Sequence, residues 1–433
     1  MSASARIIRG RIVSFTDDPA AAGLSARHYL DDGAVLVRDG LIEAVGEARD
    51  VLADAPEGAP VDDHSGSLVM PGFIDAHIHY PQTQVIGSYG AQLLDWLHNY
   101  TFVEEQKFAD HGHCARIAEF FLEELIRCGT TTAMVYCTVH PQSVEAFFAA
   151  SERLGARMIA GKTMMDRDAP EALMDTPERG YEESQSLIQR WRGRGRLDYA
   201  VTPRFAVTSS KAQLEAAGAL VKENPGVYVQ THLDENKAEI ELVRRLFPEA
   251  RNYLDVYDRA GLLGPRSVFG HCVWLEDAEV AALAASRSVA AFCPTSNLFL
   301  GSGLFDAARL ERAGVRIALA TDVGGGTSYS MLATAAEGYK VLELKGQSWA
   351  AAAAFYRMTL GNARALSLED RVGSIEPGKE ADLAVIDSRA TPAMAHRMET
   401  AEGDLDAELF VLMMLGDDRA VRQTYVAGVP RKL

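Results

Sequence analysis

The feature that most constrains the fold is a regular alternation, between residues 130 and 323, of short apolar runs with longer amphipathic stretches. The short runs are rich in β-branched residues, and the longer stretches repeat apolar residues at spacings of three and four, which predicts strands alternating with helices. Repeated βα units of this kind build a parallel sheet. Together with one earlier run they give eight predicted strands: 67–79, 130–138, 157–166, 197–205, 226–232, 267–273, 288–295 and 315–322. This count predicts an α/β fold, a TIM-like (β/α)8 barrel.

The two ends of the chain differ from this middle part. Residues 1–66 contain short apolar runs separated by Asp-Gly turns, and two further apolar runs lie at 381–386 and 424–429. Short runs punctuated by turn residues are typical of short β-strands. We therefore expect a small β domain built from both termini, residues 1–66 and 376–433, beside a catalytic barrel over residues 67–375.

Charge and cysteine content narrow the range of partners and compartments. The chain has 43 Lys and Arg residues against 60 Asp and Glu residues, and its net charge of −17 disfavours binding to nucleic acid and to anionic membrane surfaces. Its five cysteines are scattered without a CxxC pair, which favours a reducing compartment. Arg6, Arg9 and Arg11 interrupt the apolar runs of the N-terminus, and no run approaches the roughly 18 apolar residues of a membrane span. These features predict a cytoplasmic protein and leave small neutral or cationic partners open.

Two histidines stand two residues apart at the end of the first predicted barrel strand. Side chains alternate between the faces of a strand, so Asp75, His77 and His79 are expected to share the inward face. The other face then carries the apolar residues Ile74, Ala76 and Ile78. Barrels keep their active sites at the carboxyl ends of the strands, where such a pair can bind a metal ion.

A second pair of the same spacing shows how weak this motif is by itself. His111 and His113 follow Asp110 and precede an amphipathic stretch, and we interpret them as a solvated helix start. The first pair gains weight because His232, His271 and Asp322 each stand where another predicted strand ends. Each of these three residues alone could be a structural strand terminator. Together with His77 and His79 they offer nitrogen and carboxylate ligands that suit Zn²⁺ or Fe²⁺, with room for a water molecule.

Several segments resemble a known superfamily. The metal-binding and proton-transfer signatures of the amidohydrolase superfamily are similar to segments 71–79, 231–235, 270–275 and 321–330. Within that superfamily, the chain most closely resembles the guanine deaminase family, in segments 79–82, 93–97, 100–102, 202–205 and 321–328. The resemblance covers nearly the whole chain. It implies a metal-dependent hydrolase that converts guanine to xanthine and ammonia, and it suggests a homodimer.

The resemblance also implies the number of metal ions. Lys162 could be mistaken for the carbamylated lysine that bridges two metals in some relatives, but a lysine entering a loop is more often a solvated charge or an ion-pair partner. The spacing of His232 and Glu235 is similar to that of the mononuclear deaminases, in which the glutamate carries protons. We therefore expect one divalent metal ion, Zn²⁺ in preference to Fe²⁺, held by His77, His79, His232 and Asp322.

The remaining roles follow from the same resemblance. Glu235 is expected to move protons between water and the purine ring, although a glutamate at a helix start can also be an ordinary surface residue. Asp322 is expected to act both as ligand and as base. His271 is expected to hydrogen-bond the attacking water, although the equivalent histidine is a metal ligand in binuclear relatives.

Substrate recognition is assigned to residues around these groups. Arg204 is a fixed cation that suits the carbonyl oxygen at C6 of guanine, and Gln82 offers a donor and an acceptor to ring nitrogens. Trp96 and Phe205 are expected to cover the purine faces, unless they only pack the core. His232 is expected to contact the substrate as well as the metal.

Three other interpretations stay open. A related aminohydrolase acting on 8-oxoguanine, a pterin or a triazine would share the metal ligands and differ at Gln82, Arg204 and Phe205. A phosphate-binding barrel could use the glycine-rich segment 322–328, but this segment lacks Lys and Arg and opens with a carboxylate, which repels an anion. A non-catalytic barrel of the same fold is the third alternative.

Overall fold

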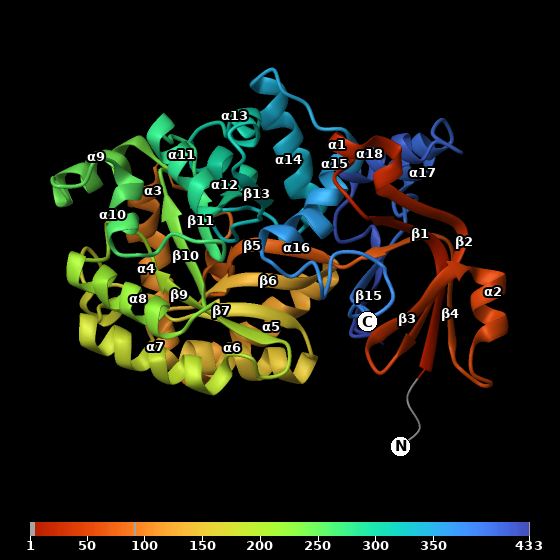
Figure 1. Cartoon of the computed structure of the whole chain (residues 1–433), viewed down its shortest axis with the longest axis horizontal. Helices are drawn as coiled ribbons and strands as arrows, with labels where there is room; N and C mark the ends of the chain where they lie inside the picture. The colour runs from red at the N-terminus through yellow and green to blue at the C-terminus, as the bar shows by residue number, and fades with distance from the viewer. Residues whose placement is uncertain (1–4, 91, 433) are drawn as a thin grey trace.

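The computed structural model describes residues 5–90 and 92–432. Figure 1 shows a barrel surrounded by helices and, beside it, a smaller twisted sheet that contains the first strands of the chain. None of the helices in these described parts is long and apolar enough to cross a membrane.

Eight parallel strands form the barrel, and each overlaps one of the predicted runs. They are β5 (Phe73–His79), β6 (Thr130–Tyr136), β7 (Arg157–Gly161), β9 (Leu197–Pro203), β10 (Tyr228–Leu233), β11 (Ser267–His271), β12 (Val289–Phe292) and β13 (Arg316–Leu319). Neighbours in this order pair in parallel, and a short strand, β8 (Thr163–Met164), pairs with β9. The predicted TIM-like barrel is confirmed.

Helices connect these strands and cover the outside of the barrel (Figure 1). The connecting helices are α5 (His111–Arg127), α6 (Pro141–Leu154), α7 (Pro177–Trp191), α8 (Lys211–Glu223), α9 (Lys237–Leu246), α10 (Tyr253–Arg259), α11 (Asp277–Ser286), α12 (Pro294–Phe299) and α13 (Ala307–Arg312). Many begin at a residue whose side chain accepts a hydrogen bond from the first turn, as Thr176 does for α7 and Ser210 for α8. Further helices lie between β5 and α5 or follow β13: α3 (Leu93–Trp96), α4 (Phe102–Glu105), α14 (Met331–Leu344), α15 (Ala351–Tyr356) and α16 (Asn362–Ala365).

The second sheet joins the two ends of the chain. Its strands, in spatial order, are β16 (Val429–Pro430), β15 (Val421–Val426), β14 (Leu383–Ile386), β4 (Val61–Pro71), β1 (Ala5–Phe15), β2 (Arg27–Arg38) and β3 (Leu41–Glu47). The helices α1 (Pro19–Ala22), α2 (Ala48–Asp54), α17 (Pro392–Met398) and α18 (Leu405–Leu415) belong to the same terminal segments. Because β4 pairs antiparallel with β14, both termini contribute to one sheet, as predicted. The domain boundaries themselves stay a prediction.

The expected first strand, 67–79, is divided in the structure. Its first part belongs to β4 of the small sheet, which ends at Pro71, and its second part is β5 of the barrel. The chain passes between the two sheets at Gly72, where an added Cβ would lie 2.3 Å from the hydroxyl oxygen of Thr131. Only glycine leaves room for this close passage, and hence for the change of sheet.

The strand β5 also departs from simple alternation. Its pairing with β6 shifts register between Asp75 and Ile78, as in a β-bulge. Ile74 and Ala76 pack in a cluster to which all eight barrel strands contribute, whereas Ile78 packs in the separate, larger cluster. The expectation that Ile74, Ala76 and Ile78 share one face is therefore wrong, because the irregularity re-aims the side chains that follow it.

The seam between the first and last barrel strands is closed by residues at and beyond the end of β13. The backbone N–H of Asp322 donates to the carbonyl of His77 at 2.9 Å, and that of His79 donates to the carbonyl of Val323 at 2.8 Å. Farther down the seam, the amide of Asn362 donates to the carbonyls of Ile74 (2.6 Å) and Leu319 (2.7 Å). The oxygen of the same amide accepts from the backbone of Leu319 at 2.9 Å. One fully buried side chain thus connects β5 to β13.

We predict that Asn362→Ala lowers the free energy of unfolding by about 2–4 kcal/mol, since it leaves buried backbone groups on both strands without a partner. Urea denaturation of the purified protein measures this loss. Asn99→Ala, at an exposed asparagine, is the control and should change stability by less than about 0.5 kcal/mol. A similarly small loss for Asn362→Ala would contradict the role of this residue in closing the barrel.

Candidate metal and active site

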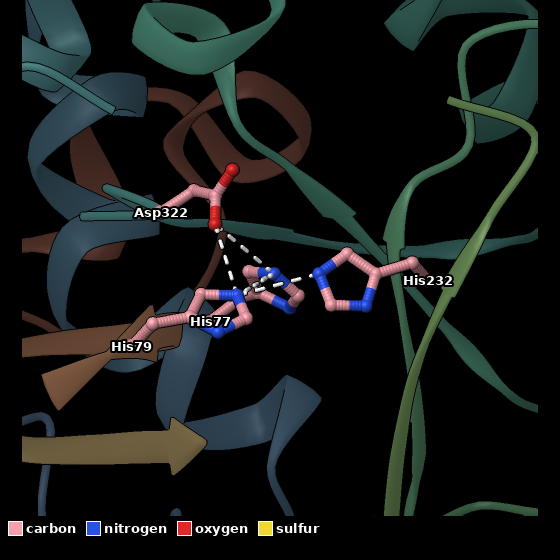
Figure 2. A group of neighbouring side chains, drawn as sticks. All are labelled: His77, His79, His232 and Asp322. Carbon is pink, nitrogen blue, oxygen red and sulfur yellow. Dashed lines mark hydrogen bonds and ion pairs between the residues drawn. The ribbon is translucent and has the colours of Figure 1, made fainter. Parts of the chain in front are cut away.

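Four predicted metal ligands converge at the carboxyl ends of the barrel strands. His77 and His79 come from β5, His232 from β10, and Asp322 follows β13. The Nε2 atom of His79 lies 3.3 Å from Nε2 of His77 and 3.3 Å from Nε2 of His232. The Oδ1 atom of Asp322 lies 3.3 Å from Nε2 of His77 and 3.2 Å from Nε2 of His79. Figure 2 shows the three rings and the carboxylate turned toward one another.

The neighbours of these side chains fix their positions. Gly270 precedes His271 on β11, and a Cβ at this glycine would lie 2.6 Å from Cε1 of His77, so glycine makes room for the ring. Asp322 has a left-handed backbone conformation with φ of 53°, and His271 has one with φ of 68°. Such conformations are uncommon for residues with a side chain, and they concentrate at functional sites.

The chemistry of the four groups fits a divalent cation. Nδ1 of His232 lies 2.7 Å from the carbonyl oxygen of Arg204, which can only accept, so Nδ1 carries the hydrogen and Nε2 presents a lone pair to the other ligands. Burial lowers the pKa of His79 to about 3 and that of His232 well below its ordinary value, so both rings are neutral at pH 7.

The separations of the ligand atoms agree with this conclusion. Ligands placed about 2.0–2.1 Å from a tetrahedral metal ion lie roughly 3.3–3.4 Å apart. The observed separations of 3.2–3.3 Å are close to this value. Facing lone pairs and a carboxylate repel one another unless a cation lies between them, so these residues can hold a divalent metal ion.

A second group overlaps the first. His77, His271, Cys293 and Asp322 also bring one ligand atom each within 4.8 Å of one another. His271 therefore lies close enough to the ligands to act either on the metal or on a water molecule beside it, which is the alternative that the sequence left open. Cys293 follows β12 and was not predicted as part of the site, although it ends a strand as the other site residues do.

Glu235 lies beside His271 and is held by two neighbours. Its Oε2 is 3.3 Å from Nε2 of His271, and its Oε1 accepts a hydrogen bond of 3.0 Å from the hydroxyl of Ser302. Nδ1 of His271 is 2.9 Å from the amide oxygen of Asn297. Burial, followed by the negative charge of Asp322, raises the pKa of Glu235 to about 8. This carboxyl group can therefore hold a proton at neutral pH and give it up.

Ser302 and Asn297 were not predicted from the sequence. Asn297 lies in α12, in the segment that follows β12, so its place after a strand end was a usable signal. Ser302 lies in a loop and carries no comparable signal.

A cavity opens on these groups. Its lining includes all five residues expected to recognise the substrate: Gln82, Trp96, Arg204, Phe205 and His232. The lining also contains His79, Glu235, His271 and Asp322, so metal ligands and recognition residues face one space. Leu93, Leu97, Leu300 and Gly325 complete it and were not predicted.

The polar side of the cavity rests on a buried ion pair. Nη1 of Arg204 lies 2.8 and 2.7 Å from the two carboxylate oxygens of Glu105, the last residue of α4. The amide nitrogen of Gln82 lies 3.4 Å from the same carboxylate, and its amide oxygen accepts from the backbone of Gly324 at 3.2 Å. Glu105, which is 99 residues from its partner, was not predicted from the sequence.

The structure decides between the two alternatives for Lys162 and corrects one expectation about the second histidine pair. Lys162 is fully buried and forms ion pairs with Asp175 and Glu183, so it is an ion-pair partner and not a solvated charge. The helix α5 does begin at His111, which is exposed. His113, however, is buried against the ring of Phe108, with ring centroids 4.8 Å apart, because the first turn already faces the core.

Comparison with known proteins gives consistent matches over the full length. The chain matches the amidohydrolase family over residues 68–430. It is 46% identical to the guanine deaminase of Escherichia coli over 426 residues, which are 98% of this chain and 97% of that protein. The solved structure of E. coli guanine deaminase covers 98% of this chain, and 99% of its own chain, with a TM-score of 0.96 at 46% identity. A guanine deaminase from C. acetobutylicum with guanine bound in its active site has a TM-score of 0.87 at 26% identity, covering 98% of this chain and 99% of that one.

We predict that the purified protein holds a divalent metal ion and that His79→Ala loses most of it, because the four-ligand group then has only three members. Elemental analysis of the dialysed protein measures the metal content per chain. The control is His396→Ala, at an exposed histidine, which should keep the metal. Unchanged metal content in His79→Ala would rule out this ligand group.

Proposed function

Because the chain belongs to the amidohydrolase family, we propose that it is a hydrolase that converts guanine and water to xanthine and ammonia. The observation that carries the proposal is one cavity that is lined both by three of the four ligands, His79, His232 and Asp322, and by the buried Arg204. The full-length similarity to guanine deaminases supports the same substrate.

The metal in this proposal is one zinc ion, held by His77, His79, His232 and Asp322. Three imidazole nitrogens and one carboxylate oxygen are ligands that zinc prefers, while Fe²⁺ would accept the same set. When bound, the ion would supply an activated water molecule at neutral pH, because it lowers the pKa of that water to about 7.

Glu235 is the proposed proton donor to the purine. Guanine carries its amino group on C2, next to ring nitrogen N3, and addition of water at C2 is easier when N3 is protonated. With a pKa raised to about 8, the carboxyl of Glu235 holds a proton at neutral pH and can transfer it to N3. The hydroxyl of Ser302, 3.0 Å away, keeps this carboxyl turned toward the cavity.

Asp322 and His271 are proposed to handle the attacking water. Asp322 accepts a proton from the water through the oxygen that faces His271, whose Nε2 lies 3.7 Å away. His271 hydrogen-bonds the oxygen that becomes attached to C2 and so stabilises the charge that develops there. Asp322 then passes the proton it took to the departing amino group, which leaves as ammonia, and the hydroxyl left on C2 gives its proton back to Glu235 as the carbonyl forms.

Recognition of guanine is assigned to the other side of the cavity. The guanidinium of Arg204 donates to the carbonyl oxygen at C6, which adenine lacks, and Gln82 pairs with ring nitrogens. The rings of Phe205 and Trp96 cover the purine; Phe205 lies beside the ligand His232, with ring centroids 6.3 Å apart. His232 itself borders both the metal and the substrate.

We also propose that the protein acts in the cytoplasm, as a homodimer, and binds neither nucleic acid nor membranes. The five cysteines, all buried and free, support the cytoplasmic location. The net charge of −17 supports the absence of binding to nucleic acid and to anionic membranes. The homodimer rests on the resemblance to the family.

The direct test is to incubate the zinc-loaded protein with guanine, adenine, cytosine and 8-oxoguanine and to measure ammonia release. We expect release from guanine at a kcat/KM well above that for the other three bases. Release from none of the purines would refute the substrate, and faster release from 8-oxoguanine would transfer the proposal to that base.

We predict that Arg204→Ala lowers kcat/KM for guanine by about 10- to 100-fold, the effect of losing a hydrogen bond to a charged donor, and leaves the zinc content unchanged. Steady-state kinetics and elemental analysis of the same preparation test both parts. Arg190→Ala, at an exposed arginine, is the matched control. Equal loss of activity and metal would show that Arg204 supports the fold and does not read the base.

A further inference from the structure

Glu105 contacts two of the residues that line the cavity without being part of the described lining itself. Both of its carboxylate oxygens lie within 2.8 Å of Nη1 of Arg204, and Oε1 is also 3.4 Å from the amide nitrogen of Gln82. The side chains of Glu105 and Arg204 are only 1% and 4% exposed. This burial makes the pair a fixed element of the cavity wall.

The pair sets the charge of this side of the cavity. An arginine stays protonated in proteins, so Arg204 brings a permanent positive charge into a buried place. Glu105 neutralises this charge. The hydrogen bonds to Glu105 use Nη1 of the guanidinium. Among the described residues no hydrogen bond uses Nε or Nη2, so these two atoms are available to a ligand. Arg204 thus presents oriented donors with little net charge.

This matters because substrate and product of the proposed reaction differ in acidity. The inference here rests on the proposed function. Guanine is neutral near pH 7, whereas xanthine, in which a carbonyl replaces the amino group at C2, loses a ring proton more easily. Both purines carry the carbonyl at C6. An unneutralised arginine would bind the xanthine anion more tightly than neutral guanine, since charge attracts charge strongly in a buried site.

We propose that Glu105 is a positioning residue that determines specificity: it keeps the Arg204 side of the cavity neutral, so that the protein binds guanine and releases the more acidic xanthine. Glu105 does this through Arg204 and Gln82 and has no contact with the reacting atoms. A glutamate that served only to attach α4 to the barrel would have no influence on the ratio of the two affinities.

Glu105→Gln tests the proposal, because it removes the charge while keeping the size of the side chain. We expect the inhibition constant for xanthine to fall by at least about tenfold, because the charge of Arg204 is then no longer neutralised and strengthens its hydrogen bond to xanthine. We also expect kcat/KM for guanine to fall. The gain for xanthine should increase as the pH is raised and xanthine ionises. Zinc content is measured in parallel and should not change.

Glu104→Gln is the matched control. Glu104 precedes Glu105 in α4, but its carboxylate pairs with Lys107 at 2.5 Å, so the same substitution there should leave the xanthine inhibition constant unchanged. A gain of equal size in Glu104→Gln would overturn the proposal, because it would reflect total charge and not the pair with Arg204.

Arg204→Gln provides a second test of opposite sign, which decides the matter if Glu105→Gln does not fold. It leaves Glu105 as an uncompensated negative charge, so xanthine should lose more affinity than guanine. In the double variant that combines Glu105→Gln with Arg204→Gln, the gain in affinity for xanthine should disappear.

Two results would overturn this inference: an equal loss of affinity for guanine and xanthine in Glu105→Gln, or an unchanged ratio of the two affinities in both single variants. Either result would leave the proposed function intact, provided that the unmodified protein still deaminates guanine. If the unmodified protein neither deaminates guanine nor is inhibited by xanthine, the proposed function fails and this inference fails with it.

Discussion

The backbone hydrogen bonds across the seam of the barrel are the constraint on which the site depends. Asp322 donates to the carbonyl of His77, and His79 donates to the carbonyl of Val323, so the two ligands of the first strand and the ligand that follows the last strand are joined by the main chain. Asp75 accepts from the backbone and the hydroxyl of Thr321 in the same seam. A change of register here would separate the ligands as well as open the barrel, which makes closure of the fold and assembly of the site one event.

Burial then determines what the assembled site can bind. It keeps the imidazoles of His79 and His232 neutral by lowering their pKa values, and the carbonyl of Arg204 directs the lone pair of His232 toward the other ligands. Burial acts in the opposite direction on Glu235, because the charged form of a carboxyl group is the one that water stabilises. The same low-dielectric environment thus yields neutral metal ligands on one side and a carboxyl that holds a proton on the other.

The sequence predicted the parts of this arrangement that follow from local patterns. Apolar periodicity gave the eight strands, and polar residues at strand ends gave His77, His79, His232, His271 and Asp322, whose ligand atoms the structure brings together. Glu235 came from the family resemblance and lines the same cavity as His79, His232, His271 and Asp322. It could not predict the irregularity in β5, because a register shift depends on the partner strand and leaves no mark in the alternation of β5 itself. Glu105, Asn297 and Ser302 escaped for a related reason: their partners lie 99, 26 and 67 residues away, and their importance comes from contact alone.

Three of the residues that were not predicted from the sequence share one property, which explains why the site needs them. Each holds a polar group that faces the cavity: Ser302 holds Glu235, Asn297 holds His271, and Glu105 holds Arg204. A buried polar side chain without such a partner would either lose its orientation or impose the full cost of its desolvation. The reacting side of the cavity therefore uses neutral partners, a hydroxyl and an amide, which leave the proton of Glu235 free to move. On the recognition side the partner is a carboxylate, because a guanidinium cannot lose its proton and only an opposite charge can balance it.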